Sequence, residues 1–244
     1  MKENNYKREF DFTYTNLEKI LTNAISYGYR FIRHDEYAEN KNYSDKIILL
    51  RIDVDSKINN LRSILPILKK NKIKATIFFR VHSEFYNLFG FESIRIVNQC
   101  ISDGHEIGYH SEIVDVEMIN NIDALSVLKK DISIMETFFG IKIKGIASHG
   151  GLTGYNNLDF WKNNNPRNLG YSYEAYHDDF QLFNKCLYIS DSENYRWKKY
   201  LNGKVIKSKD VIEPSKELRK DNKLVNLLIH PDIYYNNHVY EDYL

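Results

Sequence analysis

KIILLRIDVDS, residues 46–56, is an apolar run of strand length that ends in two aspartates, Asp53 and Asp55. Residues 47–50 are continuously apolar, and Ile52 and Val54 follow, which is typical of a strand buried on both faces of a parallel sheet. Similar runs recur along the chain as KATIFFRV (74–81), HEIGYH (105–110), IKIKGIASHGG (141–151), KCLYISD (185–191) and KLVNLLIHPD (223–232).

The segments between these runs carry helical signals. Residues 15–28 combine Thr15 as a predicted N-cap, apolar residues at helical spacing and a terminal Gly28. Residues 58–72 predict a helix in which Pro66 causes a kink or marks the first turn. Two further helices are predicted over residues 91–104 and 119–140, the second as one long helix.

Strands and helices therefore alternate, which predicts an α/β chain with a parallel sheet, either a barrel or an open sheet. No repeat, low-complexity block or Pro/Gly-rich linker interrupts the 244 residues. We expect residues 1–244 to form a single domain.

The composition of the chain gives no reason to expect a nucleic acid or a membrane as its partner. Lys plus Arg number 34 and Asp plus Glu number 33, so no charge excess predicts nucleic acid or an anionic membrane as partner. No apolar run approaches the roughly 20 residues of a membrane span. The N-terminal residues MKENNYKREFDF lack the apolar core of a secretory signal, and Cys100 and Cys186 lie in apolar contexts typical of buried, reduced thiols. These features together predict a cytoplasmic protein.

Polar residues stand where the predicted strands end. In a parallel barrel these ends meet on one face, where barrel enzymes have their active sites. Some of these residues could be N-caps of the following helices, as Asp55 or Ser56 could be, but capping does not explain repeated histidines. The strand-end residues are Asp53, Asp55, Arg80, His82, His110, Ser148, His149, Asp191, His230 and Asp232.

Imidazole and carboxylate groups around one point suit zinc or a similar divalent ion. Asp53 and Asp55 are two residues apart and share a face of a regular strand, so one could bind the metal while the other acts as a base. His230 could act as general acid on the leaving group. No phosphate-binding glycine loop is present, and ASHGG (147–151) lacks the nucleophile-elbow pattern.

The order of these motifs resembles the NodB-type polysaccharide deacetylases, carbohydrate esterase family 4. LLRIDVDS (49–56) resembles their first motif, ATIFFRV (75–81) the strand after it, GHEIGYHS (104–111) their second motif and LLIHPD (227–232) their last. The resemblance covers about residues 46–235, and the combination of motifs looks most like the deacetylase-like proteins of O-antigen and capsule biosynthesis. It implies an irregular barrel of about seven parallel strands, with residues 1–45 as a helical extension packed on the barrel, and one divalent metal ion, zinc first.

Four residues take roles from this resemblance. Asp53 matches the catalytic base, Asp55 and His110 match metal ligands, and His230 matches the general acid. The family's second metal-binding histidine sits four residues after His110, where this chain has Val114.

Val114 cannot bind a metal, so the third ligand has to come from elsewhere. His149 is the first candidate because it ends the neighbouring strand, and Glu112 and Asp115 are the alternatives. The family's third motif normally carries an Arg and a Pro, and IASHGG (146–151) has neither. His105 and Glu106 are expected to be structural.

The predicted activity is hydrolytic removal of an acetyl group from an acetamido sugar, as a nucleotide- or lipid-linked glycan precursor in surface-polysaccharide biosynthesis. Two alternatives stay open. One is a carbohydrate-binding barrel that has lost its metal, and the other is a metal-dependent amidase or phosphoesterase. Ser148, Asp191, Arg196 and Trp197 are predicted to contact the sugar, while Trp161, Tyr171 and Tyr173 are equally compatible with stacking on sugar rings and with the core.

Overall fold

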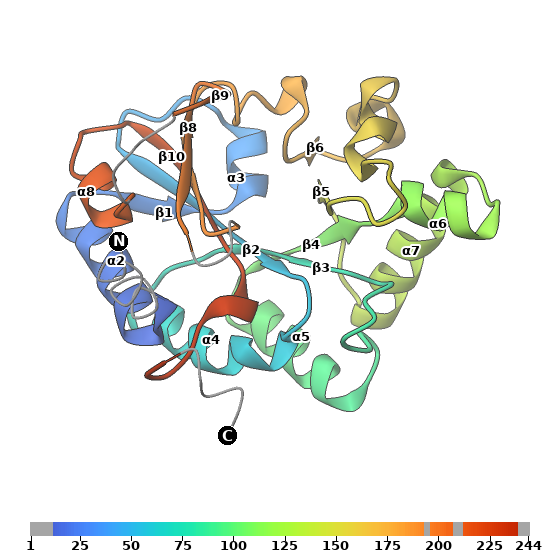
Figure 1. Cartoon of the computed structure of the whole chain (residues 1–244), viewed down its shortest axis with the longest axis horizontal. Helices are drawn as coiled ribbons and strands as arrows, with labels where there is room; N and C mark the ends of the chain where they lie inside the picture. The colour runs from blue at the N-terminus through green and yellow to red at the C-terminus, as the bar shows by residue number, and fades with distance from the viewer. Residues whose placement is uncertain (1–11, 193–195, 207–211, 239–244) are drawn as a thin grey trace, which may run out of the picture.

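The structure is a computed structural model that describes residues 12–192, 196–206 and 212–238. Its centre is one ten-stranded sheet, in which seven neighbouring strands run parallel in the order β6-β5-β4-β3-β2-β10-β7 (Figure 1). The bounds of these strands are β2 Ile47–Val54, β3 Thr76–Phe79, β4 Glu106–Ser111, β5 Gly145–Ser148, β6 Tyr173–Glu174, β7 Leu187–Ser190 and β10 Leu224–Ile229.

Three more strands extend this sheet. β1, Arg30–Ile32, pairs in parallel with the start of β2, and the antiparallel strands β8, Lys198–Leu201, and β9, Lys204–Val205, follow β7. In the described ranges no ladder joins β6 to β7, β8 or β9, so the ring of strands is not closed. The α/β class with about seven parallel strands is confirmed.

Helices connect the strands and cover the sheet. They are α2 Tyr14–Ser26, α3 His34–Glu39, α4 Leu61–Lys70, α5 Phe91–Ser102, α6 Ile113–Asn120, α7 Ala124–Phe139 and α8 Pro214–Leu218, with 3-10 turns η2 Ile58–Asn60, η3 Asn157–Lys162, η4 Arg167–Leu169, η5 Asp178–Phe180 and η6 Pro231–Ile233. Among the described residues no helix is both long and apolar enough to cross a membrane.

Two helix predictions need correction, and one of the two alternatives given for Pro66 is excluded. The N-cap of α2 is Thr13, whose hydroxyl accepts a hydrogen bond from the Asn16 N–H, and Thr15 lies inside the helix. Pro66 lies inside α4 and does not mark its first turn. The long helix predicted for residues 119–140 is two helices, because Asn121 adopts a left-handed φ of 53° that ends α6, and Asp123 then caps α7.

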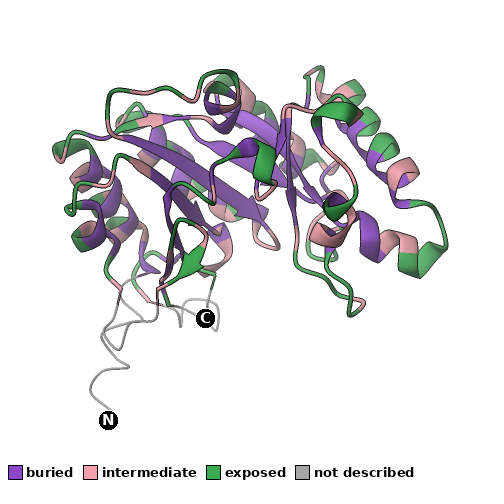
Figure 2. Ribbon diagram, turned by 90° about the horizontal axis from the view of Figure 1, so that it is seen from above, coloured by how far each residue is buried: buried purple, intermediate pink, exposed green. Residues whose placement is uncertain are grey.

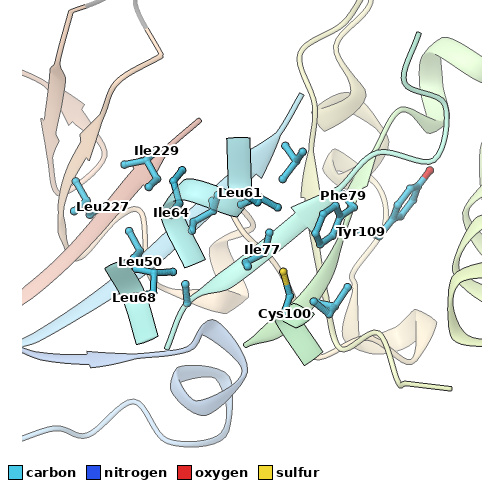
Figure 3. Close-up of a cluster of buried hydrophobic side chains, with 14 of the residues drawn as sticks. Leu50, Leu61, Ile64, Leu68, Ile77, Phe79, Cys100, Tyr109, Leu227 and Ile229 are labelled. Atoms are coloured by element: carbon cyan, nitrogen blue, oxygen red, sulfur yellow. The ribbon is translucent and has the colours of Figure 1, made fainter. Parts of the chain in front are cut away.

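Alternating residues of β2 point to opposite faces of the sheet. Ile48, Leu50, Ile52 and Val54 face the outer helices and belong to the larger core cluster, whereas Leu49 belongs to a second cluster on the inner face. Figure 3 shows the larger cluster, where Leu50, Ile77, Leu227 and Ile229 of the sheet lie beside Leu61, Ile64 and Leu68 of α4. Figure 2 shows the result, with a buried sheet and helices that are buried only on their inner side.

This alternation positions the polar end of β2. Arg51 and Asp53 have the parity of Leu49 and so point to the inner face, not toward the helices. Both cysteines are buried free thiols, as predicted.

Candidate active site

Asp53 and Asp55 lie at the carboxyl end of β2 and mark the centre of the candidate site. Asp53 is 2% exposed, whereas the side chain of Asp55 keeps 28% exposure and reaches the surface. Burial opposes the charge of Asp53, but Arg51 and His110 outweigh it and hold the pKa of this carboxyl below its ordinary value. Both aspartates are therefore carboxylates at neutral pH, because the pKa of Asp55 is lowered as well.

His110 of β4 points at these two aspartates. Its Nε2 lies 3.2 Å from Oδ1 of Asp55 and 3.5 Å from Oδ2 of Asp53. Its Nδ1 lies 2.8 Å from the carbonyl oxygen of Ala147. A carbonyl oxygen only accepts hydrogen bonds, so Nδ1 carries a proton. Burial opposes the charge of the imidazole, but Asp53 and Asp55 outweigh it and raise the pKa of His110.

His149 follows β5 and lies against His110, with the two ring centroids 5.2 Å apart. Its Nε2 lies 3.9 Å from Oδ1 of Asp55, and its Nδ1 lies 3.5 Å from Oε1 of Glu112. Burial and the neighbouring His110 lower the pKa of His149, which keeps the imidazole neutral at neutral pH. His149 therefore lies next to both Asp55 and His110.

Asp115 and one oxygen of Glu112 already have other partners, while Oε2 of Glu112 is buried without a hydrogen-bond partner among the described residues. Oε1 of Glu112 accepts from the Arg80 guanidinium, and Arg80 also donates to the carbonyl oxygen of Asp55 at 2.9 Å. Asp115 accepts hydrogen bonds from the backbone N–H groups of Leu152 and Thr153, both at 2.9 Å, so it holds a loop.

His230 follows β10 and lies on the other side of Asp55. Its Nε2 is 3.9 Å from Oδ2 of Asp55, and its Nδ1 is 2.5 Å from Oδ1 of Asp191. The backbone N–H of His230 donates to the second oxygen of Asp191 at 2.8 Å. Burial opposes protonation of the imidazole, but Asp191 and Asp55 outweigh it and raise the pKa of His230 to about 9.

The prediction that Asp191 contacts a sugar is wrong. Asp191 is buried, and both of its carboxylate oxygens accept hydrogen bonds from His230. A carboxylate in this position orients the imidazole and favours its protonated form.

The predicted contact of Trp197 with the sugar also needs correction. It is 6% exposed and stacks on Phe12 at a centroid distance of 5.6 Å inside the larger core cluster, so no sugar ring can reach its face. Trp161 and Tyr173 are buried core residues as well, and Tyr171 packs against the same core.

Ser148 and Arg196 are the two remaining residues that were predicted to contact the sugar. Ser148 is buried next to His149, and its backbone N–H donates to Glu174. Arg196 is exposed and forms an isolated bridge with Ser192 after β7.

The other histidines of the strand ends are structural. His82 pairs with Asp131 at 2.9 Å, outside the cluster. As predicted, His105 accepts from the backbone N–H of Ala75, and the buried Glu106 accepts from Thr76 and Tyr173.

The supporting roles of Arg51 and Asp232 were not predicted. Arg51 pairs with Asp53 through Nε to Oδ1 at 2.8 Å and through a terminal nitrogen to Oδ2 at 2.7 Å. The signal was available, because an arginine inside an otherwise apolar strand has to find a buried partner. Oδ1 of Asp232 accepts from the backbone N–H groups of Ser56 and Lys57. Asp232, and not Asp55, therefore satisfies the start of the turn after β2.

Among the residues that the structure describes, no group of three or more histidine, cysteine, aspartate or glutamate side chains has the geometry of a finished metal site. The chemistry of the donors nevertheless fits one. Oδ1 of Asp55 is buried without a hydrogen-bond partner. Its separation from Nε2 of His110, 3.2 Å, is close to the edge, about 3.3 Å, of a tetrahedron with bonds of about 2.0 Å, and its separation from Nε2 of His149, 3.9 Å, is longer. One carboxylate and two imidazoles are donor groups of the kind that bind a divalent ion.

The family model described as polysaccharide deacetylase matches residues 40–178. No curated protein sequence matches the chain.

Solved structures are similar only at low identity. A deacetylase of Streptococcus pyogenes, PplD, in complex with acetate is 19% identical over 53% of this chain and 59% of its own length, with a TM-score of 0.42. The chitin deacetylase of the fungal pathogen Colletotrichum lindemuthianum is 16% identical over 75% of this chain and 73% of its own, with a TM-score of 0.43. A CE4-family pseudoenzyme of Bacillus anthracis is 18% identical over 78% and 56%, with a TM-score of 0.41. The match thus spans less than two thirds of the Streptococcus enzyme.

Proposed function

The chain belongs to the polysaccharide deacetylase family, and we propose that it is a metal-dependent hydrolase that removes the acetyl group from an N-acetylated sugar. The observation that carries the proposal is the meeting of two carboxylates and three imidazoles at the carboxyl ends of the parallel strands. The five residues are Asp53, Asp55, His110, His149 and His230.

Asp55, His110 and His149 would hold the divalent ion, with zinc the first choice for a donor set of one carboxylate and two neutral imidazoles. When bound, such an ion polarises the amide carbonyl of the substrate and lowers the pKa of a water molecule. His110 is already oriented for this role, because its Nδ1 proton is fixed on the Ala147 carbonyl oxygen and its Nε2 faces the centre.

Asp53 would accept the proton of the attacking water. It lies on the same face of β2 as Asp55, and its Oδ2 is within 3.5 Å of His110 at the centre. Its pKa lies below the ordinary value, so at neutral pH it is a carboxylate without a proton of its own.

His230 would protonate the departing amine. Its pKa of about 9 keeps it an imidazolium at neutral pH, and Asp191 accepts from its Nδ1. The proton on Nε2 therefore lies on the side of Asp55, where His230 could transfer it to the leaving amine.

The test is an acetate-release assay with the full chain loaded with Zn²⁺, Co²⁺ or Ni²⁺ in separate samples. Candidate substrates are a nucleotide-linked N-acetylhexosamine, a polyprenyl-phosphate-linked N-acetylhexosamine and a chitin oligosaccharide. We expect acetate by NMR from at least one of them, loss of activity after chelation, and recovery on adding metal. Absence of acetate from all three at full metal loading would contradict the proposal.

The substrate and the cellular setting are also part of the proposal. A nucleotide- or lipid-linked precursor of a surface polysaccharide, handled in the cytoplasm, is supported by the combination of the motifs in residues 46–56, 104–111 and 227–232.

A second candidate is a carbohydrate-binding barrel without catalysis. Val114, at the position of the family's second histidine, favours it, as does the absence of a finished metal group among the described residues. Sugar binding by calorimetry, combined with no metal uptake, would support this candidate over the hydrolase.

A further inference from the structure

Arg80 and Glu112 form a buried ion pair directly beside the candidate metal ligands. Their side chains are 4% and 3% exposed, and the Arg80 guanidinium donates to Oε1 of Glu112. The same guanidinium donates to the backbone carbonyl oxygen of Asp55 at 2.9 Å. Because the desolvation of two charges offsets most of their attraction, the pair adds little stability, and its position points to a role in the site.

Both members of the pair are held in place by the ends of the sheet strands. Arg80 directly follows β3, and its backbone N–H donates to the Tyr86 hydroxyl at 2.9 Å. That hydroxyl donates in turn to the carbonyl oxygen of Val54 at the end of β2. Glu112 directly follows β4 and precedes α6. The direction of the Glu112 carboxylate is therefore set by a guanidinium that is itself attached to β2.

His149 lies next to this carboxylate. Its Nδ1 is 3.5 Å from Oε1 of Glu112, and its Nε2 is 3.9 Å from Oδ1 of Asp55. Nδ1 of His149 and Oε2 of Glu112 are both buried, and neither atom has a hydrogen-bond partner among the described residues. Unpaired buried polar atoms are unfavourable, which favours a hydrogen bond between these two side chains.

The neutral imidazole of His149 has a single proton, for which two carboxylates compete. Its pKa is lowered by burial and by His110, so at neutral pH the proton lies either on Nδ1, facing Glu112, or on Nε2, facing Asp55. Glu112 is the nearer acceptor, and Oδ1 of Asp55 already faces Nε2 of His110 at 3.2 Å. The geometry therefore favours a proton on Nδ1 and a lone pair on Nε2.

We propose that Glu112 is a positioning residue that holds the proton of His149 on Nδ1, so that Nε2 presents its lone pair to the divalent ion, and that Arg80 fixes Glu112 in this role. This inference rests on the proposed function, in which His149 is the third ligand. A carboxylate on the far nitrogen of a metal-binding histidine fixes the tautomer of the ring and strengthens the ligand. Since Arg80 also holds the backbone of Asp55, it positions two ligands relative to each other.

The first measurement is the tautomer of His149 in the metal-free full chain. Nitrogen chemical shifts of the imidazoles, recorded by NMR at one neutral pH, distinguish Nδ1–H from Nε2–H, and the spectrum of His149→Ala identifies the signals. We expect Nδ1–H in the wild type. Glu112→Gln keeps the size of the side chain but removes its charge, so Nε2–H should appear. It should increase further in the double variant Arg80→Met/Glu112→Met, where Asp55 is the remaining carboxylate that faces the ring.

The second measurement is Zn²⁺ affinity by calorimetry. Glu112→Gln should weaken Zn²⁺ binding about tenfold, the size expected when an orienting partner of a ligand is changed. His149→Ala should weaken it more, because it removes the ligand itself. Glu217→Gln is a matched control, since Glu217 of α8 is a similarly buried carboxylate that pairs with Lys199 of β8 at 2.9 Å, outside the cluster of site residues. It should leave the tautomer and the affinity unchanged.

Circular dichroism and thermal unfolding identify any variant that fails to fold. The double variant leaves no unpaired buried charge and is expected to fold, since apolar residues often replace a buried ion pair without loss of stability. A lower Tm in folded Glu112→Gln, with the tautomer and the Zn²⁺ affinity unchanged, would make the pair merely structural and overturn the inference. Nε2–H in the metal-free wild type would overturn it as well. A greater loss of Zn²⁺ from Glu112→Gln than from His149→Ala would make Glu112 the ligand and also overturn it.

These outcomes are separate from turnover. If the wild-type protein releases no acetate from any sugar, the proposed function fails, while the NMR and calorimetric results still decide the role of Glu112. If the wild type releases acetate but Glu112→Gln keeps the wild-type tautomer and affinity, the inference fails and the proposed function stands.

Discussion

His230 and Asp191 form a double contact, in which Nδ1 of the imidazole lies 2.5 Å from Oδ1 of the carboxylate and the backbone N–H of His230 donates to Oδ2. The contact joins the ends of two neighbouring strands, β10 and β7. It fixes both the tilt of the ring and the nitrogen that carries the free proton. Activity should therefore depend on the charge of Asp191, although Asp191 does not face the substrate side.

Asp191→Asn should lower the pH at which activity is lost on the alkaline side. The pKa of His230 is raised to about 9 in the folded protein, so an acid of this kind works below pH 9 and is lost as the pH rises through that value. An amide in place of the carboxylate removes the attraction and moves this limit toward the ordinary value of about 6.5. A kcat profile between pH 6 and pH 10 measures the shift, and an unchanged alkaline limb would exclude His230 as the acid.

The same pair should make stability depend on pH. A raised pKa in the folded state contributes stability that is complete below about pH 6.5 and disappears as the pH rises through about 9. Thermal unfolding of the wild-type protein should therefore lose part of its Tm over this window, and Asp191→Asn should lose less there. Equal losses in the two proteins would contradict the coupling.

Asp55→Asn should lose most of the bound metal, because an amide is a poorer ligand than a carboxylate. Asp53→Asn should keep the metal and lose turnover by about 10²–10⁴-fold, and His230→Ala should behave in the same way. Elemental analysis and acetate release measured on the same samples separate the two patterns. Loss of metal from Asp53→Asn, with metal retained by Asp55→Asn, would invert the roles.

His149→Ala should weaken metal binding more than Glu112→Ala, since Nε2 of His149 faces Asp55 while Glu112 is held by Arg80. The expected loss for His149→Ala is at least about tenfold in affinity, measured by calorimetry. Val114→His offers a gain-of-affinity variant. The reverse order of the two alanine variants would make Glu112 the third ligand.

Asn157→Ala should destabilise the protein by about 1–3 kcal/mol, because it leaves buried polar groups without partners. Its Oδ1 accepts from the N–H groups of Val114 and Asp115, and its Nδ2 donates to Asp115 and to the carbonyl oxygen of His149. Urea unfolding measures the change. The exposed Asn163→Ala, at the end of η3, is a control that should stay within about 0.5 kcal/mol of the wild type.

The sequence predicted the strand ends well because parallel strands carry a strong signal, a continuous apolar run followed by a polar residue. It did not predict β1 or the hairpin of β8 and β9, whose residues are mixed in polarity. The break between α6 and α7 rests on the left-handed Asn121 within a helical pattern, which apolar periodicity does not reveal.

The candidate site, like the fold, could be predicted only in part. His110, His149 and His230 could be found because each directly ends or follows a strand. The burial of Trp197 could not be predicted, because an aromatic residue gives the same sequence signal in a core as on a sugar-binding surface. The packing of Arg51 against Tyr176 could not be predicted either, because the two residues are distant in sequence and meet only in the folded chain.

The position of β10 between β2 and β7 has a consequence for how the protein forms. The strand that precedes His230 comes last in sequence among the described strands, yet it lies in the middle of the sheet, where Leu224 pairs with Ile47 and Val225 pairs with Leu187. Until it arrives on the ribosome, two unsatisfied strand edges face each other, with a high tendency to associate with other chains. Correct assembly of the active site and protection from aggregation thus depend on the same late pairing, which has a high sequence separation and is expected to be slow.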